Sequence, residues 1–153
     1  MKETDRKVAA VFDERWRNFV LVPLVGVYLF SMLITLSHLG EPFPFMGESF
    51  SAETSESLIF TDSVVSLYLI VGILKRQQLT LWLLIVYNFV VSFNGIANLF
   101  LLPVQQIVTA SGAIVPDHHY RLNAFGIFVL FLLLNVFLYL NRRHFDNKSL
   151  YLW

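Results

Sequence analysis

The stretch LWLLIVYNFVVSFNGIANLFLL, residues 81–102, decides the fold class of this chain. It contains no charged side chain. Crossing the hydrocarbon core of a bilayer as a helix takes roughly 17 to 25 mostly apolar residues, and this stretch has that length. A helix on the surface of a soluble protein would also show a polar face, which this stretch lacks. Residues 81–102 are therefore predicted to span a membrane.

Three further apolar segments have the same character, at about residues 18–39, 58–74 and 122–140. Hydrophobic residues make up 56% of the 153 residues and charged residues 14%, against about 25% charged residues in soluble proteins. The predicted fold is all-α. It is a polytopic membrane protein with a single membrane domain over residues 1–153. Four transmembrane helices form an antiparallel bundle, and residues 40–57 and 103–121 form the outer loops.

Residues 4–17 are predicted to form an amphipathic helix that lies in the membrane interface before the first span. Apolar side chains recur there every three or four residues, and charged residues fill the other face; the apolar residues are Val8, Val11, Phe12, Trp16 and Phe19. This helix is interpreted as an anchor for the first span, with a docking helix for a cytoplasmic partner as the alternative. A cleaved signal sequence is disfavoured, because no small-residue cleavage site ends the apolar segment.

The basic residues predict the orientation. Ten of the 11 Lys and Arg residues lie in the N-terminal segment, at positions 75–76, or in the C-terminal tail. The other side of the predicted membrane has only Arg121. Because positive charge is retained on the cytoplasmic side, both termini are expected in the cytoplasm.

The two outer loops carry different signals. The first contains Pro42 and Pro44, which prevent the helix from continuing, and its phenylalanines are expected to fold back onto the bundle. In the second loop, two short β-prone runs flank Ser111 and Gly112. A small hairpin and a short interfacial helix are both open for this segment.

Polar residues inside the spans give the only functional signal. Asp62 is the one acidic residue in the four predicted spans, about one turn inside the outer end of the second, and Ser66 shares its helix face. An ionisable group inside a membrane is costly and suggests function. The other polar residues of the outward half are Asn94, Asn98, Arg121, Asn123 and His38. We predict an outward-facing polar site in which Asp62 and Arg121 form a charged pair.

Two interpretations of this site stay open. The polar residues can hold the four helices together without a ligand, or they can bind or pass a small molecule or lipid. The first makes the chain a structural or assembly subunit, and the second makes it a binding or transport module.

Catalysis, metals and cofactors are not expected. The chain has no Cys and no phosphate loop, HExxH or nucleophile elbow. His118 and His119 are adjacent, which is not a metal-ligand spacing. A lipid-active enzyme is the least favoured alternative. The expected partner is the lipid bilayer, with a homodimer or a membrane-protein complex open, and a net charge of zero gives no reason to expect nucleic acid.

Three features of the chain carry a family resemblance. They are the basic turn LKRQQ at residues 74–78, the ending YLNRRH at residues 139–144 followed by Ser149 and Leu150, and Arg121 at the start of the fourth span. Over about residues 16–150 the chain resembles the YdgK-like family of small bacterial inner-membrane proteins. The resemblance implies four helices and the bacterial inner membrane, and it implies no activity.

Overall fold

The structure, a computed structural model, describes residues 3–102, 107–108, 114–115, 117–149 and 151. Its elements, in chain order, are α1 (Glu3–Ser37), β1 (Phe43–Phe45), β2 (Glu48–Phe50), α2 (Ala52–Leu74), α3 (Gln78–Leu101), β3 (Ile107–Val108), β4 (Ile114–Val115), α4 (Asp117–Leu140) and the 3₁₀ helix η1 (Arg142–His144). In the described part of the chain, four helices are long and apolar enough to cross a membrane. The prediction of a mostly helical protein with four membrane-spanning helices is confirmed at this level.

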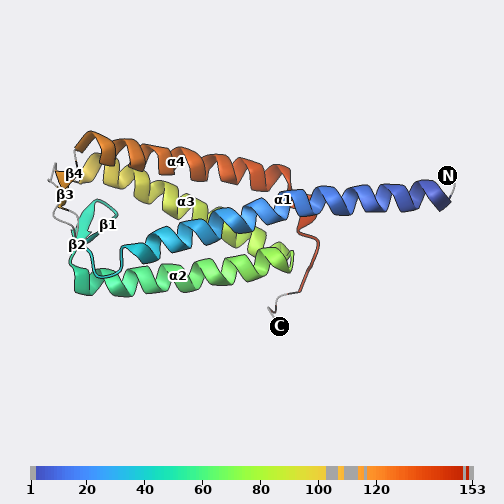
Figure 1. Ribbon diagram of the computed structural model, residues 1–153, viewed down its shortest axis with the longest axis horizontal. Coiled ribbons are helices and arrows are strands. Elements are labelled where there is room, and N and C mark those ends of the chain that lie inside the picture. The colour runs from blue at the N-terminus through green and yellow to red at the C-terminus, as the bar shows by residue number, and fades with distance from the viewer. Residues whose placement is uncertain (1–2, 103–106, 109–113, 116, 150, 152–153) are drawn as a thin grey trace.

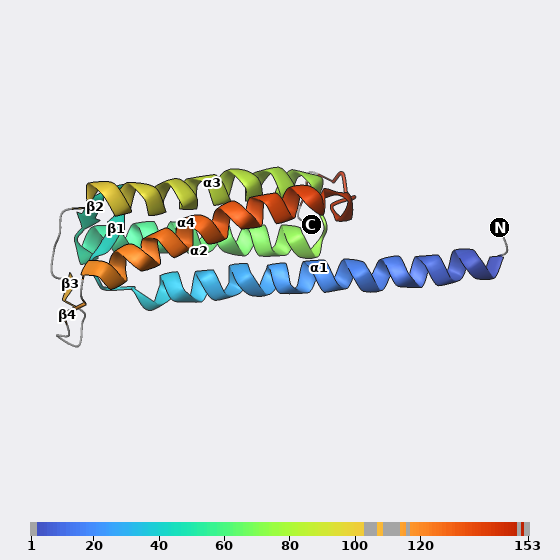
Figure 2. The ribbon, with the colours of Figure 1, turned by 90° about the horizontal axis from the view of Figure 1, so that it is seen from above.

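The first helix is longer than the sequence predicted. α1 runs without a break from Glu3 to Ser37, and it extends straight beyond the other helices (Figures 1 and 2). Residues 4–17 are thus helical, and they continue into the first span without the change of direction that an interfacial helix predicts. Residues 3–22 contain no glycine or proline that would end a helix, and Pro23 lies inside α1. The first span is the part of α1 from Phe19 to Ser37.

The bundle consists of two helix pairs. α1 packs mainly on α2, and α3 packs mainly on α4. Gly95 allows the close approach of the second pair, because a Cβ atom added there would lie 3.1 Å from the carbonyl oxygen of Ala124. α2 and α3 meet at the turn between them and diverge toward the opposite end of the bundle (Figure 1). The contacts between the two pairs therefore depend on long side chains.

A β-hairpin lies between the diverging ends of α2 and α3 (Figure 1). In it, β1 and β2 pair antiparallel, with Phe43 opposite Phe50 and Phe45 opposite Glu48. Met46 and Gly47 form its two-residue turn with φ angles of 51° and 85°, the positive values that tight hairpins require. The first loop thus folds back onto the bundle, as expected. We call this end of the bundle the hairpin end.

α2 begins at Ala52, ahead of the predicted start of the second span at about residue 58. Residues 52–57 are polar, and they form a helix outside the apolar segment. Glu53 lies in the first turn, where an acidic side chain favours the positive end of the helix dipole. The hydropathy of the sequence marked only the apolar part of this helix.

In the second loop, the described residues form the strand pair of a small hairpin, one of the two structures left open by the sequence. Ile107 pairs with Val115 and Val108 with Ile114. α4 then begins at Asp117, ahead of the predicted residue 122.

The opposite end, which we call the terminal end, is closed by the C-terminal tail. The backbone N–H of Gln78 donates to Asn147 over 2.8 Å, and the N–H of Asn147 donates to Arg76 over 3.1 Å. Gln77 is fully buried, and its side-chain amide donates to the carbonyl oxygen of Tyr151 over 2.7 Å. The tail therefore pairs with the turn that joins α2 and α3.

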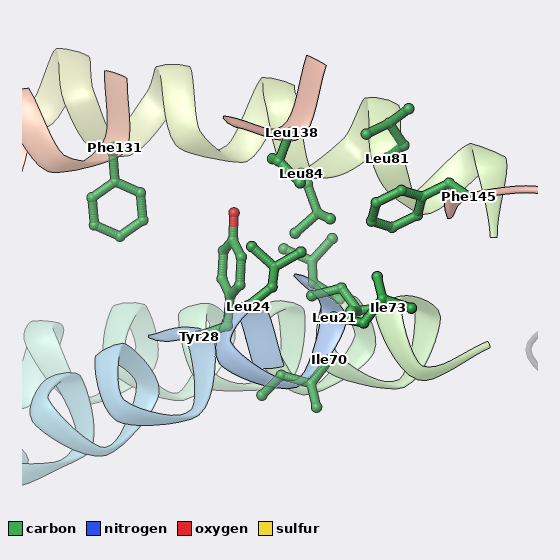
Figure 3. Close-up of a cluster of buried hydrophobic side chains, with 11 residues drawn as sticks. Leu21, Leu24, Tyr28, Ile70, Ile73, Leu81, Leu84, Phe131, Leu138 and Phe145 are labelled. Atoms are coloured by element: carbon green, nitrogen blue, oxygen red, sulfur yellow. The ribbon is translucent and has the colours of Figure 1, made fainter. Parts of the chain in front are cut away.

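Apolar side chains fill the terminal half of the bundle. Figure 3 shows them projecting toward one another from all four helices, joined by one residue after η1. They are Leu21, Leu24, Tyr28, Leu69, Ile70, Ile73, Leu81, Leu84, Phe131, Leu138 and Phe145. Only 22% to 33% of the residues in the most apolar part of each span are buried inside the protein. The remaining apolar surface is suited to contact with lipid chains.

Candidate functional site

Asp62 lies near the middle of its helix. α2 has 23 residues and begins at Ala52, so Asp62 lies ten positions after its first residue. Residues 52–57 are polar, and the apolar segment of α2 begins at Leu58. Counted from there, Asp62 lies about one turn inside the apolar segment, and its depth in a membrane stays a prediction.

The carboxyl group of Asp62 meets hydroxyl groups from three helices. The phenol of Tyr87 on α3 donates to Oδ1 of Asp62 over 2.9 Å. Ser66, one turn along α2 and buried, has its Oγ 3.2 Å from the same phenol oxygen. Thr35 on α1 makes a further side-chain hydrogen bond with Asp62. We call Thr35, Asp62, Ser66 and Tyr87 the carboxyl site.

A second group of polar side chains lies beside the carboxyl site. The phenol of Tyr28 on α1 donates to Oδ1 of Asn88 on α3 over 2.7 Å. The amide of Asn88 donates to Oδ1 of Asn135 on α4 over 2.9 Å, and the amide of Asn135 donates to the carbonyl oxygen of Ile85 over 3.3 Å. We call Tyr28, Asn88 and Asn135 the amide bridge.

The two groups touch through their aromatic rings. The ring centroids of Tyr28 and Tyr87 are 6.2 Å apart. Figure 3 shows Tyr28 reaching from α1 toward α3 and α4, with its hydroxyl at the far end. The carboxyl site and the amide bridge therefore connect one helix pair to the other, in the region where the two pairs are held by long side chains.

The predicted residues Asn94 and Asn98 hold the hairpin instead of lining the carboxyl site. Oδ1 of Asn94 accepts the backbone N–H of Met46 over 2.7 Å, and Oδ1 of Asn98 accepts the N–H of Gly47 over 2.8 Å. The amide of Asn98 also donates to the carbonyl oxygen of Pro44 over 3.2 Å. These two side chains fix the hairpin turn against α3.

The remaining predicted site residues lie at the hairpin end. Arg121 donates to the carbonyl oxygen of Leu99 over 3.3 Å, and Asn123 is exposed. His38 has Nδ1 2.8 Å from the carbonyl oxygen of Ile34, and its ring lies at an angle to Phe43 with centroids 6.3 Å apart. Of the seven predicted site residues, only Asp62 and Ser66 lie in the carboxyl site.

The predicted pair of Asp62 with Arg121 is not formed. The hydrogen bonds of Asp62 go to Tyr87 and Thr35, and no ion pair with Asp62 is found among the described residues. The physical reason is that each group has other partners, because Tyr87 and Thr35 bond to Asp62 and the guanidinium of Arg121 reaches the carbonyl oxygen of Leu99 near the end of α3. Asp62 is thus a carboxyl group inside the bundle whose described contacts are neutral hydroxyl groups.

Sequence reasoning missed Tyr28 and Tyr87. A signal was present, because a tyrosine in the middle of a span must place its hydroxyl on a hydrogen-bond partner when no water is available. Tyr87 directly precedes Asn88 in the sequence, so α3 offers polar groups on two adjacent faces at that depth.

A resident metal ion is given no support by the described residues, in which no group of three or more His, Asp or Glu side chains could hold one. The carboxyl site offers one carboxyl group and three hydroxyl groups, which can accept a proton, a hydrogen-bonding ligand or a single positive charge. No family model, curated protein or solved structure matches the chain, so its interpretation depends on this geometry alone.

Proposed function

We propose that this membrane protein binds a small molecule between its two helix pairs, at the carboxyl site. The observation that supports the proposal is the placement of Asp62. An ionisable group inside a membrane-spanning helix is costly and is for that reason a functional candidate. Asp62 lies on the buried stripe of α2, between Ile59 and Ser66, yet it remains half-buried rather than fully enclosed. Part of its surface is therefore not covered by the protein itself.

The proposal includes an orientation. With the basic residues retained in the cytoplasm, the hairpin end faces outward and the site is reached from that side. The resemblance to the YdgK-like family would place the chain in the bacterial inner membrane. A protein tag fused after residue 153 should be inaccessible from outside intact cells, and labelling of that tag from outside would contradict this orientation.

A structural or assembly subunit is the second candidate. It is favoured by Asn88, Asn94, Asn98 and Asn135, whose amide groups all bond within the chain. Such residues stabilise a bundle without any ligand. This candidate predicts that Asp62 affects only stability. We propose no catalytic role for either candidate.

The decisive experiment compares Asp62→Asn with the wild type. Purified protein in an uncharged detergent is heated with one of three probes of similar size: tetraphenylphosphonium, which is cationic, tetraphenylborate, which is anionic, and neutral tetraphenylmethane. A bound probe raises the melting temperature by mass action. We expect at least one probe to stabilise the wild type and to lose that effect in Asp62→Asn.

Asp146→Asn is the matched control, because it removes a carboxylate outside the carboxyl site. Asp146 is exposed and pairs with Arg76 over 3.6 Å at the terminal end. This variant should respond to the probes as the wild type does. If Asp62→Asn lowers the melting temperature and changes no probe response, the assembly candidate is correct and the binding proposal is wrong.

A further inference from the structure

The carboxyl site has the chemistry to distinguish ligands by charge. Asp62 has no ion pair among the described residues, and its contacts with Tyr87 and Thr35 are with neutral hydroxyl groups. An unpaired carboxylate that is half-buried among helices carries a desolvation cost. A positive charge bound beside it would offset that cost.

From this geometry we propose that Asp62 exchanges its proton for a monovalent organic cation that carries apolar groups. The inference rests on the proposed function and specifies the class of ligand. The exchange is balanced: the neutral carboxylic acid and the free cation give a carboxylate–cation pair and one proton released to water. No bond other than the O–H bond is broken, and nothing is oxidised or reduced.

The aromatic surroundings favour an organic cation over a metal ion. The ring of Tyr87 is half-buried and its hydroxyl bonds to Asp62, and aromatic faces attract organic cations. Tyr28, with its ring centroid 6.2 Å from that of Tyr87, is fully buried and supports that ring from inside the bundle. A divalent ion such as Ca²⁺ takes six to eight oxygen ligands, commonly from several carboxylates, whereas this site has one. A single negative charge is matched by a single positive charge.

The exchange also requires that the titratable groups around Asp62 do not change protonation when the cation binds. The titratable groups facing Asp62 are the phenols of Tyr87 on α3 and Tyr28 on α1, and phenols are neutral near pH 7. His38 follows the end of α1, three residues beyond Thr35, and contacts the hairpin through Phe43. Arg121 on α4 bonds to Leu99 at the hairpin end. Asp62 is therefore the acidic group of the carboxyl site.

The ligand class makes a direct prediction about protons. Tetraphenylphosphonium is added to the purified protein in weak buffer with a pH-indicating dye, and the bound probe is counted by equilibrium dialysis. We expect about one proton released per cation bound by the wild type, and affinity that falls about tenfold for each pH unit below the apparent pKa of the site. Asp62→Asn should release none and bind at least about tenfold more weakly.

Two control variants show whether a loss of proton release comes from the missing carboxyl group. Asp62→Glu keeps the acid and should keep proton release, which separates loss of the carboxyl group from loss of folding. Asp146→Asn should behave as the wild type. Binding of tetraphenylphosphonium with equal proton release in Asp62→Asn, or without any release in the wild type, would overturn the exchange.

The same experiment distinguishes the two proposals. If neutral tetraphenylmethane or anionic tetraphenylborate binds in an Asp62-dependent way and the cation does not, the small-molecule site stands and the cation exchange is wrong. If none of the three probes binds in an Asp62-dependent way, both proposals are wrong.

Discussion

Tyr28→Phe tests whether the amide bridge holds the two helix pairs together. The change removes only the phenol oxygen, which donates to Oδ1 of Asn88 over 2.7 Å. Both side chains are fully buried, so no water replaces the lost partner. Leaving a buried acceptor without its donor costs about 1–3 kcal/mol in soluble proteins, and interhelical hydrogen bonds in membranes reach about 1.7 kcal/mol. We expect a loss of about 1–2 kcal/mol in the free energy of unfolding.

The assay is reversible unfolding in mixed micelles with increasing sodium dodecyl sulfate, followed by tryptophan fluorescence. A loss of that size lowers the ratio of folded to unfolded protein by a factor of about 5 to 30. The matched control is Tyr139→Phe. Tyr139 is exposed, and its ring, not its hydroxyl, meets the guanidinium of Arg142 at 4.5 Å. The control should change stability by less than about 0.5 kcal/mol.

A double-mutant cycle identifies the bond itself. Tyr28→Phe is combined with Asn88→Ala, and residues that interact directly show a coupling energy of about 0.5–3 kcal/mol. Tyr28→Phe that changes stability no more than Tyr139→Phe, or strictly additive effects in the cycle, would refute the reasoning.

Two glycines provide further predictions. Gly72→Ala places a Cβ atom 2.8 Å from Cβ of buried Thr80, so α2 and α3 must separate. We expect the free energy of unfolding to fall by at least about 1–3 kcal/mol. Gly26→Ala is the control, because nothing lies within 4 Å of the added Cβ atom, and it should be close to neutral in the same unfolding assay. Gly47→Ala adds a Cβ atom 2.5 Å from Cβ of Leu101 at a φ of +85°; it should make the hairpin sensitive to limited proteolysis while the helices stay folded, and an unchanged cleavage pattern would contradict the hairpin geometry.

The membrane-spanning segments were predictable because hydropathy and length are local properties of a sequence. Residues 81–102 contain no charged group, and a helix through them follows from the need to satisfy backbone hydrogen bonds in lipid. The helix ends were less predictable. Residues 52–57 are polar and form the start of α2, which hydropathy alone did not mark as helical.

The partners in the candidate site depend on tertiary structure. That Asn94 and Asn98 bind the turn of a hairpin about 50 positions earlier in the chain cannot be read from the spacing of either segment. The same holds for Tyr28, which finds Asn88 only because α1 and α3 lie in different helix pairs that face each other. The sequence identified Asp62 as the unusual residue, and the structure corrected its neighbours.

The C-terminal tail has a consequence for biosynthesis. The residues that pair with the α2–α3 turn, Asn147 and Tyr151, are made only after all four helices have been synthesised. Until then Gln77 and the carbonyl group of Arg76 lack the partners that the tail supplies, and polar groups at the terminal end stay uncovered. The final step of assembly is thus a backbone pairing between distant segments, and a chain cut short before residue 147 would keep its four spans but leave that end open.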